Sequence, residues 1–563
     1  MGVPSVAPKP DLSQPGLDQL ADEIECLKRR ISALEQLVSR SAPDITPVSS
    51  AVLPALNLNP SAGAVVLLGK ALLGIAGAYF LRALVEASIL PRPLGIALGM
   101  LYSAAWLCLA ARTPKAQRFA GALDACASIL IFVPLLWEAT MRFRVVPLWA
   151  AALLISFYAA FGIILSWIYP QPLTMRLALT GSAIAAIAFL IAGRDLLPFA
   201  LALLGMAAAT EILTCLHQRV DERWVVAACS DLSIVIFAYI ATRKPDALEG
   251  YSRVSWQAAL ALGAALAMIY VASSIAVLFT ERERLGLFEI VQLAVALTIA
   301  VVGGLKAAQG NTLAVSAIGI LALLAAICGY LLGAAPQAGV AKFNSKVFQT
   351  FAWALMVTGA TLLFSGVPLI LAFCAIAINC SWISHHSDDG ALKLHAAAYI
   401  ALAAFASRLP MLSLNELFGG GNQPYPALVC GILLVTGAVC YAPAIRGRSS
   451  GWQALSPMVV AATLAWIMAG AVAHTVSLAG AFAASGTGVL MALSLVLAWM
   501  GVRWHRAELV WLVYTLMALG AYKLLTRDLV QERSLPLLLS LLFFGSTLIL
   551  LARILQNRNS PAR

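Results

Sequence analysis

Several carboxylate and amide side chains stand inside long apolar runs of this sequence. Glu289 and Gln292 in LFEIVQLAV are three residues apart, so a helix would present both on one face. Asp124 in GALDACAS and Asp231 in AACSDLSIV are surrounded by small residues, which let neighbouring helices approach closely. Carboxylates in such places can bind a proton or a cation, or can hydrogen-bond to a neighbouring helix.

An ionisable group at the centre of a bilayer costs roughly 2.5–3.5 kcal/mol, so it tends to face a protein interior or a wet cavity. We therefore predict a buried polar pathway for protons or cations, formed by Lys70, Asp124, Glu211, Asp231, Glu289 and Gln292. The alternative is that these groups make interhelical hydrogen bonds that fix the bundle. Other charged residues lie near the ends of apolar runs, where long side chains reach water; these are Arg82, Glu138, Arg408 and Lys523.

The stretch GKALLGIAGAYFLRALVEASILP contains three charges in one apolar run. Arg82 and Glu86 are four residues apart and are predicted to pair near the outer membrane boundary. Lys70 precedes Arg82 by about 18 Å of helix. We therefore expect Lys70 to lie inside the membrane and to need a carboxylate from another helix or a wet cavity.

The sequence contains no catalytic motif that we can identify. SHHSDDG places His385, His386, Asp388 and Asp389 close together, with His395 following, and these are residue types that bind metals. Adjacent side chains diverge, however, and an Asp at a helix start explains the segment equally well. The sequence has no phosphate-binding loop and no GxSxG motif. We predict no metal, no cofactor and no catalytic residues, and an enzyme is the least favoured class.

The composition predicts the fold class to which these residues belong. The chain has 563 residues, of which 61% are hydrophobic and 11% charged. Apolar runs of about 20 residues follow one another from residue 62 to residue 555, as expected for helices that cross a bilayer. We predict an all-α polytopic membrane protein with about 18 transmembrane helices and short loops. Isolated basic residues between apolar runs explain the net charge of +11, so we expect a lipid bilayer and no nucleic acid as partner.

The N-terminal region differs from the rest. We expect a disordered tail at 1–16, a coiled-coil helix at 17–40, a Pro-rich linker at 41–61 and, at the other end, a tail at 556–563. Heptad spacing gives the coil an apolar seam of Leu17, Leu20, Ile24, Leu27, Ile31, Leu34 and Val38. We expect a homodimer through residues 17–38; the alternative is a single amphipathic helix lying on the membrane.

The predicted topology follows from charge and from the N-terminal residues. An even number of spans puts both termini on one side, and the basic terminal tails favour the cytoplasmic side. Residues 1–16 do not resemble a signal peptide. We expect a multi-pass protein of the bacterial inner (plasma) membrane with a cytoplasmic N-terminus.

Two stretches carry a family resemblance: GKALLGIAGAYFLRALVEASILP, and LGAYKLLTRDLVQERSLPLLLSLLFFGSTLILLARIL at residues 519–555. With the short coil and the many spans, they resemble the bacterial predicted membrane proteins of the family called domain of unknown function 2339. The resemblance implies fold and localisation, and it carries over no activity and no site residue.

Three functions fit these observations. The favoured one is a transporter or flippase-like carrier of a small or lipidic substrate, supported by the buried carboxylates and by prolines in apparent spans (Pro134, Pro198 and Pro457). The alternative is a scaffold that self-associates through its coil. A membrane enzyme acting on a lipid-linked substrate is the third.

Overall fold

The computed structural model describes residues 62–114, 117–169, 172–216, 221–243, 250–252, 254–280, 285–334, 341–387, 389–419, 424–444, 454–478, 485–530 and 534–559. The chain divides into two units, Met1–Lys70 and Ala71–Arg563, and residues 62–70 of the first unit begin helix α2. The predicted coiled coil at 17–40 and the linker at 41–61 lie outside the described residues.

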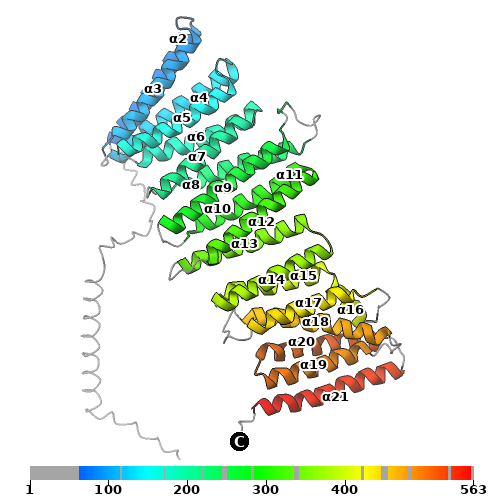
Figure 1. Ribbon diagram of the computed structural model, residues 1–563. Helices are drawn as coiled ribbons and strands as arrows, with labels where there is room; N and C mark the ends of the chain where they lie inside the picture. The colour runs from blue at the N-terminus through cyan, green and yellow to red at the C-terminus, as the bar shows by residue number, and fades with distance from the viewer. Residues whose placement is uncertain are drawn as a thin grey trace, which may run out of the picture. The chain divides into compact units, whose positions relative to one another are not determined.

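Every regular element within the described stretches is helical, because long apolar runs can satisfy their backbone groups in hydrocarbon only by forming helices. In the first half of the chain (Figure 1) these are α2 (Ala62–Glu86), α3 (Arg92–Arg112), α4 (Arg118–Trp137), the π-helix η2 (Glu138–Arg142), α5 (Leu148–Ile168), α6 (Pro172–Gly193), α7 (Leu197–Cys215), α8 (Arg223–Ala241), α9 (Trp256–Thr280), α10 (Leu287–Thr298), η4 (Ile299–Gly303) and α11 (Gly304–Ala308).

The second half continues in the same way. Its helices are α12 (Thr312–Ala334), α13 (Ala341–Leu363), α14 (Val367–Ser387), α15 (Gly390–Ala406), α16 (Leu409–Leu417), α17 (Ala427–Ala444), α18 (Leu455–Leu478), α19 (Ser485–Arg503), α20 (Ala507–Lys523), η6 (Leu524–Asp528) and α21 (Ser534–Asn559).

Length and composition identify 15 helices in the described residues that can cross a membrane, or 16 if a bent pair counts as one span. This confirms a polytopic helical membrane protein. Helix α2 and the shorter apolar helix α17 occupy two further predicted spans. The count of 18 stays a prediction.

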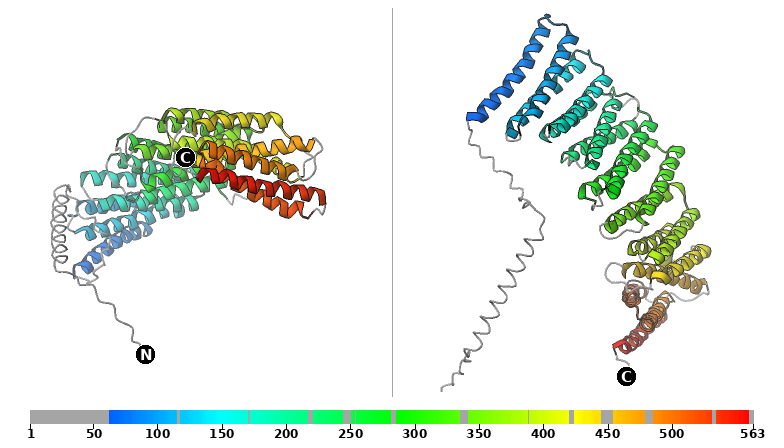
Figure 2. Two further views of the ribbon diagram at one scale, coloured as in Figure 1. Left: turned by 90° about the horizontal axis from the view of Figure 1, so that it is seen from below. Right: turned by 60° about the vertical axis from the view of Figure 1, so that its left-hand side comes forward.

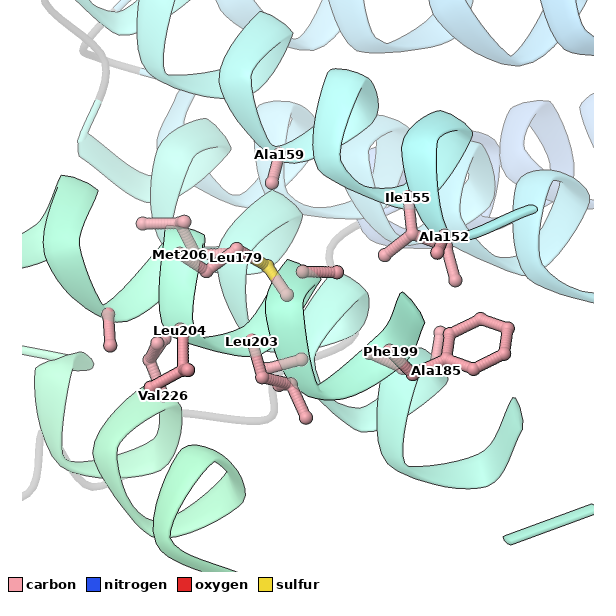
Figure 3. Packing of buried hydrophobic residues seen from close by; sticks show 14 of the residues in the cluster. Ala152, Ile155, Ala159, Leu179, Ala185, Phe199, Leu203, Leu204, Met206 and Val226 are labelled. Atoms are coloured by element: carbon pink, nitrogen blue, oxygen red, sulfur yellow. The ribbon is translucent and has the colours of Figure 1, made fainter. Parts of the chain in front are cut away.

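Helices that are neighbours in sequence pack side by side within the second unit, as both views in Figure 2 show. Figure 3 shows part of the largest apolar core, where Ile155 of α5, Leu179 of α6 and Leu203 of α7 meet. Small residues allow close contact: a methyl group at Gly162 would lie 2.4 Å from the Ala178 side chain. Dispersion contacts of this kind hold membrane helices together, because lipid is as apolar as the helices themselves.

The three prolines noted in apparent spans do not act alike. Pro134 lies inside α4 and is followed by the π-helix η2, which carries Glu138. Pro198 occupies the first turn of α7, and Pro457 is the third residue of α18. Proline is tolerated in a first turn, where its missing N–H is not needed. Pro198 and Pro457 therefore lie at helix starts and do not interrupt their helices.

Helices α15 and α16 form the bent pair, with an angle of 65° between them. Arg408 at the bend has a positive φ of 58°, and Pro410 follows in the first turn of α16. The left-handed residue ends one helix, and the proline is already fixed in the conformation that starts the next. Helix α16 is short, with nine residues from Leu409 to Leu417.

Candidate functional site

Four of the predicted pathway residues meet between α7, α8, α9 and α10. These helices pack against one another. Glu211 lies in the last turn of α7, and Glu289 lies in the first turn of α10. The chain reverses direction from one helix to the next. The C-terminal end of α7 therefore lies at the same end of the bundle as the N-terminal ends of α8 and α10. We call Glu211, Arg223, Asp231, Tyr270, Ser273, Glu289 and Gln292 the four-helix cluster.

The outermost contact of the cluster is an ion pair. Arg223 Nη2 lies 2.7 Å from Glu289 Oε1, and the two side chains are 20% and 10% exposed. The guanidinium also lies over the ring of Phe288, 4.1 Å from its centroid. An ion pair with this little exposure is screened far less than a surface pair. Arg223 is therefore held in place by both a charge and an aromatic face.

Glu211 lies beside this pair and is 4% exposed. Its Oε2 accepts a hydrogen bond from Ser273 Oγ of α9 at 2.5 Å. Arg223 of α8 and Glu289 of α10 are charged neighbours of this carboxylate.

Asp231 and Gln292 form the inner end of the cluster. Gln292 Nε2 lies 2.9 Å from each carboxylate oxygen of Asp231, to which it donates. Tyr270 is 3% exposed on α9 and lies near both Glu211 and Asp231. Asp231 follows Arg223 by eight residues on α8, which is about 12 Å along a helix. The cluster thus runs from a helix end toward the middle of the span.

The charges of the four-helix cluster do not balance. It holds three carboxyl groups (Glu211, Asp231 and Glu289) and one guanidinium, so full ionisation would leave an excess of two negative charges. Among the described residues, the buried atoms Glu211 Oε1, Glu289 Oε2 and Arg223 Nη1 have no hydrogen-bond partner. Unpaired buried charge is costly, and binding a proton or a small cation removes the cost. The arrangement can therefore take up and release positive charge.

The other predicted pathway residues lie elsewhere. Asp124 is 3% exposed on α4, which packs mainly against α3 and α6, and Gly121 beside it allows close approach. The expectation that Asp124 faces a neighbouring helix among small residues fits this position, but Asp124 is not part of the four-helix cluster. Lys70 is exposed on the surface of α2, and its predicted place inside the membrane stays a prediction.

Arg82 and Glu86 are close together, as their spacing predicts. Arg82 Nε donates to Glu86 Oε1 at 3.1 Å, and Arg82 Nη1 lies 2.8 Å from Glu138 Oε1. Glu138 belongs to η2, so the π-helix adds a second acid to the pair. The position of this pair at the membrane boundary stays a prediction.

The SHHSDDG segment has a structural explanation within the described residues. Asp389 is the N-cap of α15 and accepts a hydrogen bond from the backbone N–H of Ala391 at 3.0 Å. It also accepts one from Gln349 Nε2 at 2.8 Å. No group of three or more metal-binding side chains occurs in the described part of the chain.

The sequence interpretation missed Arg223, Ser273 and Tyr270. Arg223 stands at the start of its span, where basic residues are common, and serine and tyrosine give no signal among apolar residues. The interpretation of Lys523 as an end residue that reaches water is wrong, since Lys523 is 1% exposed.

Comparisons of the chain with family models, curated proteins and solved structures give no match. The fold and the cluster therefore define the class, which is a multi-pass helical membrane protein. The resemblance to the domain of unknown function 2339 family stays a prediction.

Proposed function

We propose that this multi-pass membrane protein is a carrier, in which the four-helix cluster binds the proton or small monovalent cation that is coupled to substrate movement. The observation that carries the proposal is the charge imbalance. The cluster holds three carboxyl groups and one guanidinium, which pairs with Glu289, and two of the buried carboxyl oxygens have no hydrogen-bond partner in the described part of the chain. A bundle held together only by hydrogen bonds would be expected to satisfy these atoms.

The geometry supports exchange with one side of the membrane. The Arg223–Glu289 pair lies at the helix ends, and Glu211 and then Asp231 follow inward. A proton or cation that reaches Glu289 would find the next carboxylate without crossing bare hydrocarbon. Ionisable residues within spans that face one another in this way are typical of proton and ion pathways.

The test is flux in proteoliposomes that contain the full chain. A membrane potential is imposed, the internal pH is followed with a dye, and the experiment is repeated with sodium and potassium gradients and a panel of small and lipidic solutes. We expect a flux that falls at least about tenfold in Glu211→Gln and Asp231→Asn, because an amide can neither release a proton nor carry negative charge.

The matched control is Asp221→Asn. Asp221 is an exposed acid just before α8 that pairs with Arg176, so this variant removes one carboxylate outside the cluster. Its flux should equal that of the unmodified chain. A folded protein that carries no ion with any solute, or a flux that persists in the Glu211→Gln/Asp231→Asn/Glu289→Gln triple variant, would contradict the proposal.

The scaffold hypothesis makes a separate prediction. Deletion of residues 1–45 should convert a dimer to a monomer if the coiled coil organises the assembly, and molar mass in detergent measures this. The flux of a carrier should survive the deletion. An unchanged molar mass would show that the coiled coil does not hold the assembly together.

A further inference from the structure

A second buried charged group lies at the C-terminal end of α16, in a different apolar core from the four-helix cluster. Lys523, the last residue of α20, is 1% exposed, and Asp528 in η6 is 6% exposed. Lys523 Nζ donates to Thr487 Oγ1 at 3.1 Å, and the Thr487 hydroxyl donates to Asp528 Oδ2 at 2.7 Å. Lys523 Nζ also lies 3.9 Å from Asp528 Oδ1.

The end of α16 supplies a backbone carbonyl to the same place. A methyl group at Gly486 would lie 2.2 Å from the carbonyl oxygen of Leu417 and 2.7 Å from Lys523 Nζ. Both atoms therefore lie close to Gly486, which brings the ammonium to the C-terminal end of α16. The C-terminal end of a helix carries partial negative charge, so a cation there is favourable. Only glycine at 486 leaves room for this approach.

The oxygens around the ammonium are those that coordinate a small cation. A threonine hydroxyl, an aspartate carboxylate and a carbonyl at the end of a half-helix are oxygen ligands of the kind that hard cations prefer. In membrane carriers, the C-terminal ends of interrupted helices serve in this way. Helix α16 is such an interrupted helix, since it is bent by 65° from α15.

The neighbouring acid on α16 is already paired. Glu416 accepts a hydrogen bond from Ser477 Oγ at 3.3 Å, and its Oε1 lies 3.0 Å from His474 Nδ1. Tyr425 stacks on His474 with 5.2 Å between ring centroids. Glu416 is thus held by α18, and the Lys523 ammonium has its own carboxylate in Asp528.

We propose that Thr487, Asp528 and the Leu417 carbonyl form a monovalent-cation site at the end of α16, and that the Lys523 ammonium is the cation that occupies it. The tethered ammonium holds the end of the bent helix against α19 and η6. The site takes ammonium, methylammonium or sodium when the lysine side chain is removed. This proposal does not depend on the carrier function.

Chemical rescue tests the proposal. The full chain with Lys523→Ala is purified in N-methyl-D-glucamine chloride, and its thermal unfolding is followed while ammonium, methylammonium or sodium chloride is added at constant ionic strength. We expect an unfolding temperature several degrees below that of the unmodified chain, and a saturable recovery with the small cations. N-methyl-D-glucamine is too large for the site and should give no recovery.

Two variants serve as matched controls. Lys523→Met removes the charge but fills the space, so small cations should not restore its unfolding temperature. Lys523→Ala/Asp528→Asn lacks the carboxylate ligand and should also show no recovery. Equal responses of Lys523→Ala and Lys523→Met to ammonium, or no response of either, would overturn the proposal.

Hydrogen exchange gives a second measurement if Lys523→Ala does not fold. In Lys523→Met, amide exchange should become faster in residues 409–419 and stay unchanged in α7, because the ammonium holds the end of α16. Unchanged exchange in residues 409–419 would overturn the proposal.

Discussion

The four-helix cluster and the α16 site use the same kinds of side chain with different charge balance. The four-helix cluster holds three carboxyl groups and one guanidinium, and buried oxygens of Glu211 and Glu289 lack partners within the described residues. In the α16 site, which consists of Thr487, Asp528, the Leu417 carbonyl and Lys523, one ammonium has one carboxylate. An unbalanced group can gain stability by binding a proton or cation, whereas a balanced group only loses stability when a member is removed. Burial alone thus does not distinguish a site of exchange from a fixed contact.

The largest expected effect is on the α16 site. Asp528→Asn leaves the Lys523 ammonium buried without its carboxylate, which should destabilise the protein by about 3–5 kcal/mol. Thermal unfolding in detergent measures this loss. The double variant Asp528→Asn/Lys523→Met removes both charges and should recover most of it. If the single and double variants unfold at the same temperature, the two side chains do not act as a pair.

Loss of Arg223 should have the next largest effect. Arg223→Met keeps the apolar contact with Phe288 and removes the only guanidinium of the four-helix cluster. We expect a loss of about 1–3 kcal/mol, less than for Asp528→Asn, because the freed carboxylates can take up protons. The same unfolding assay compares the two variants. A loss greater than that of Asp528→Asn would mean that the carboxyl groups of the cluster do not relax by protonation.

The two hydroxyl donors allow a closer comparison. Thr487 bonds to both members of an ion pair, and Ser273 bonds to Glu211 alone. Thr487→Val should therefore cost more than Ser273→Ala, for which about 1–3 kcal/mol is expected. Denaturation of the two variants under the same conditions measures which one loses more unfolding free energy. If Ser273→Ala cost more stability than Thr487→Val, the single hydrogen bond to Glu211 would contribute more than the two hydrogen bonds of Thr487.

The smallest expected effect is that of Glu211→Gln. The amide oxygen can still accept from Ser273, and the variant removes one of three crowded carboxyl groups. We expect a change in unfolding free energy within about 0.5 kcal/mol, or a gain, while the flux falls. Unfolding and flux are measured on the same preparation. A large loss of stability would show that Glu211 has a structural role. The four-helix cluster would then be a fixed contact like the α16 site.

The sequence predicts the membrane class because each span must be apolar and helical by itself. Glu211, Asp231, Glu289 and Gln292 could be named as a set because charges in apolar runs are rare. The sequence could not predict that these four side chains lie together, because the distance from Glu211 to Asp231 depends on how α7 packs against α8. The sequence also misled at Lys523, which lies close to the end of its span and yet faces Thr487 and Asp528.

The amino-acid sequence by itself determined that the chain is helical, crosses the membrane many times and carries carboxylates in its spans, because hydrocarbon permits few other ways to satisfy a backbone. Apart from Arg82 and Glu86, whose spacing predicts their contact, only the tertiary structure decided which charges pair. Helix rotation and the close contacts at Gly486 and Gly162 set the direction of each side chain, and a rotation of half a turn would exchange a lipid-facing residue for a buried one. Pro410 favours a new helix start after the left-handed Arg408, but only the packing of α16 against α18 and α19 places the end of α16 beside Lys523.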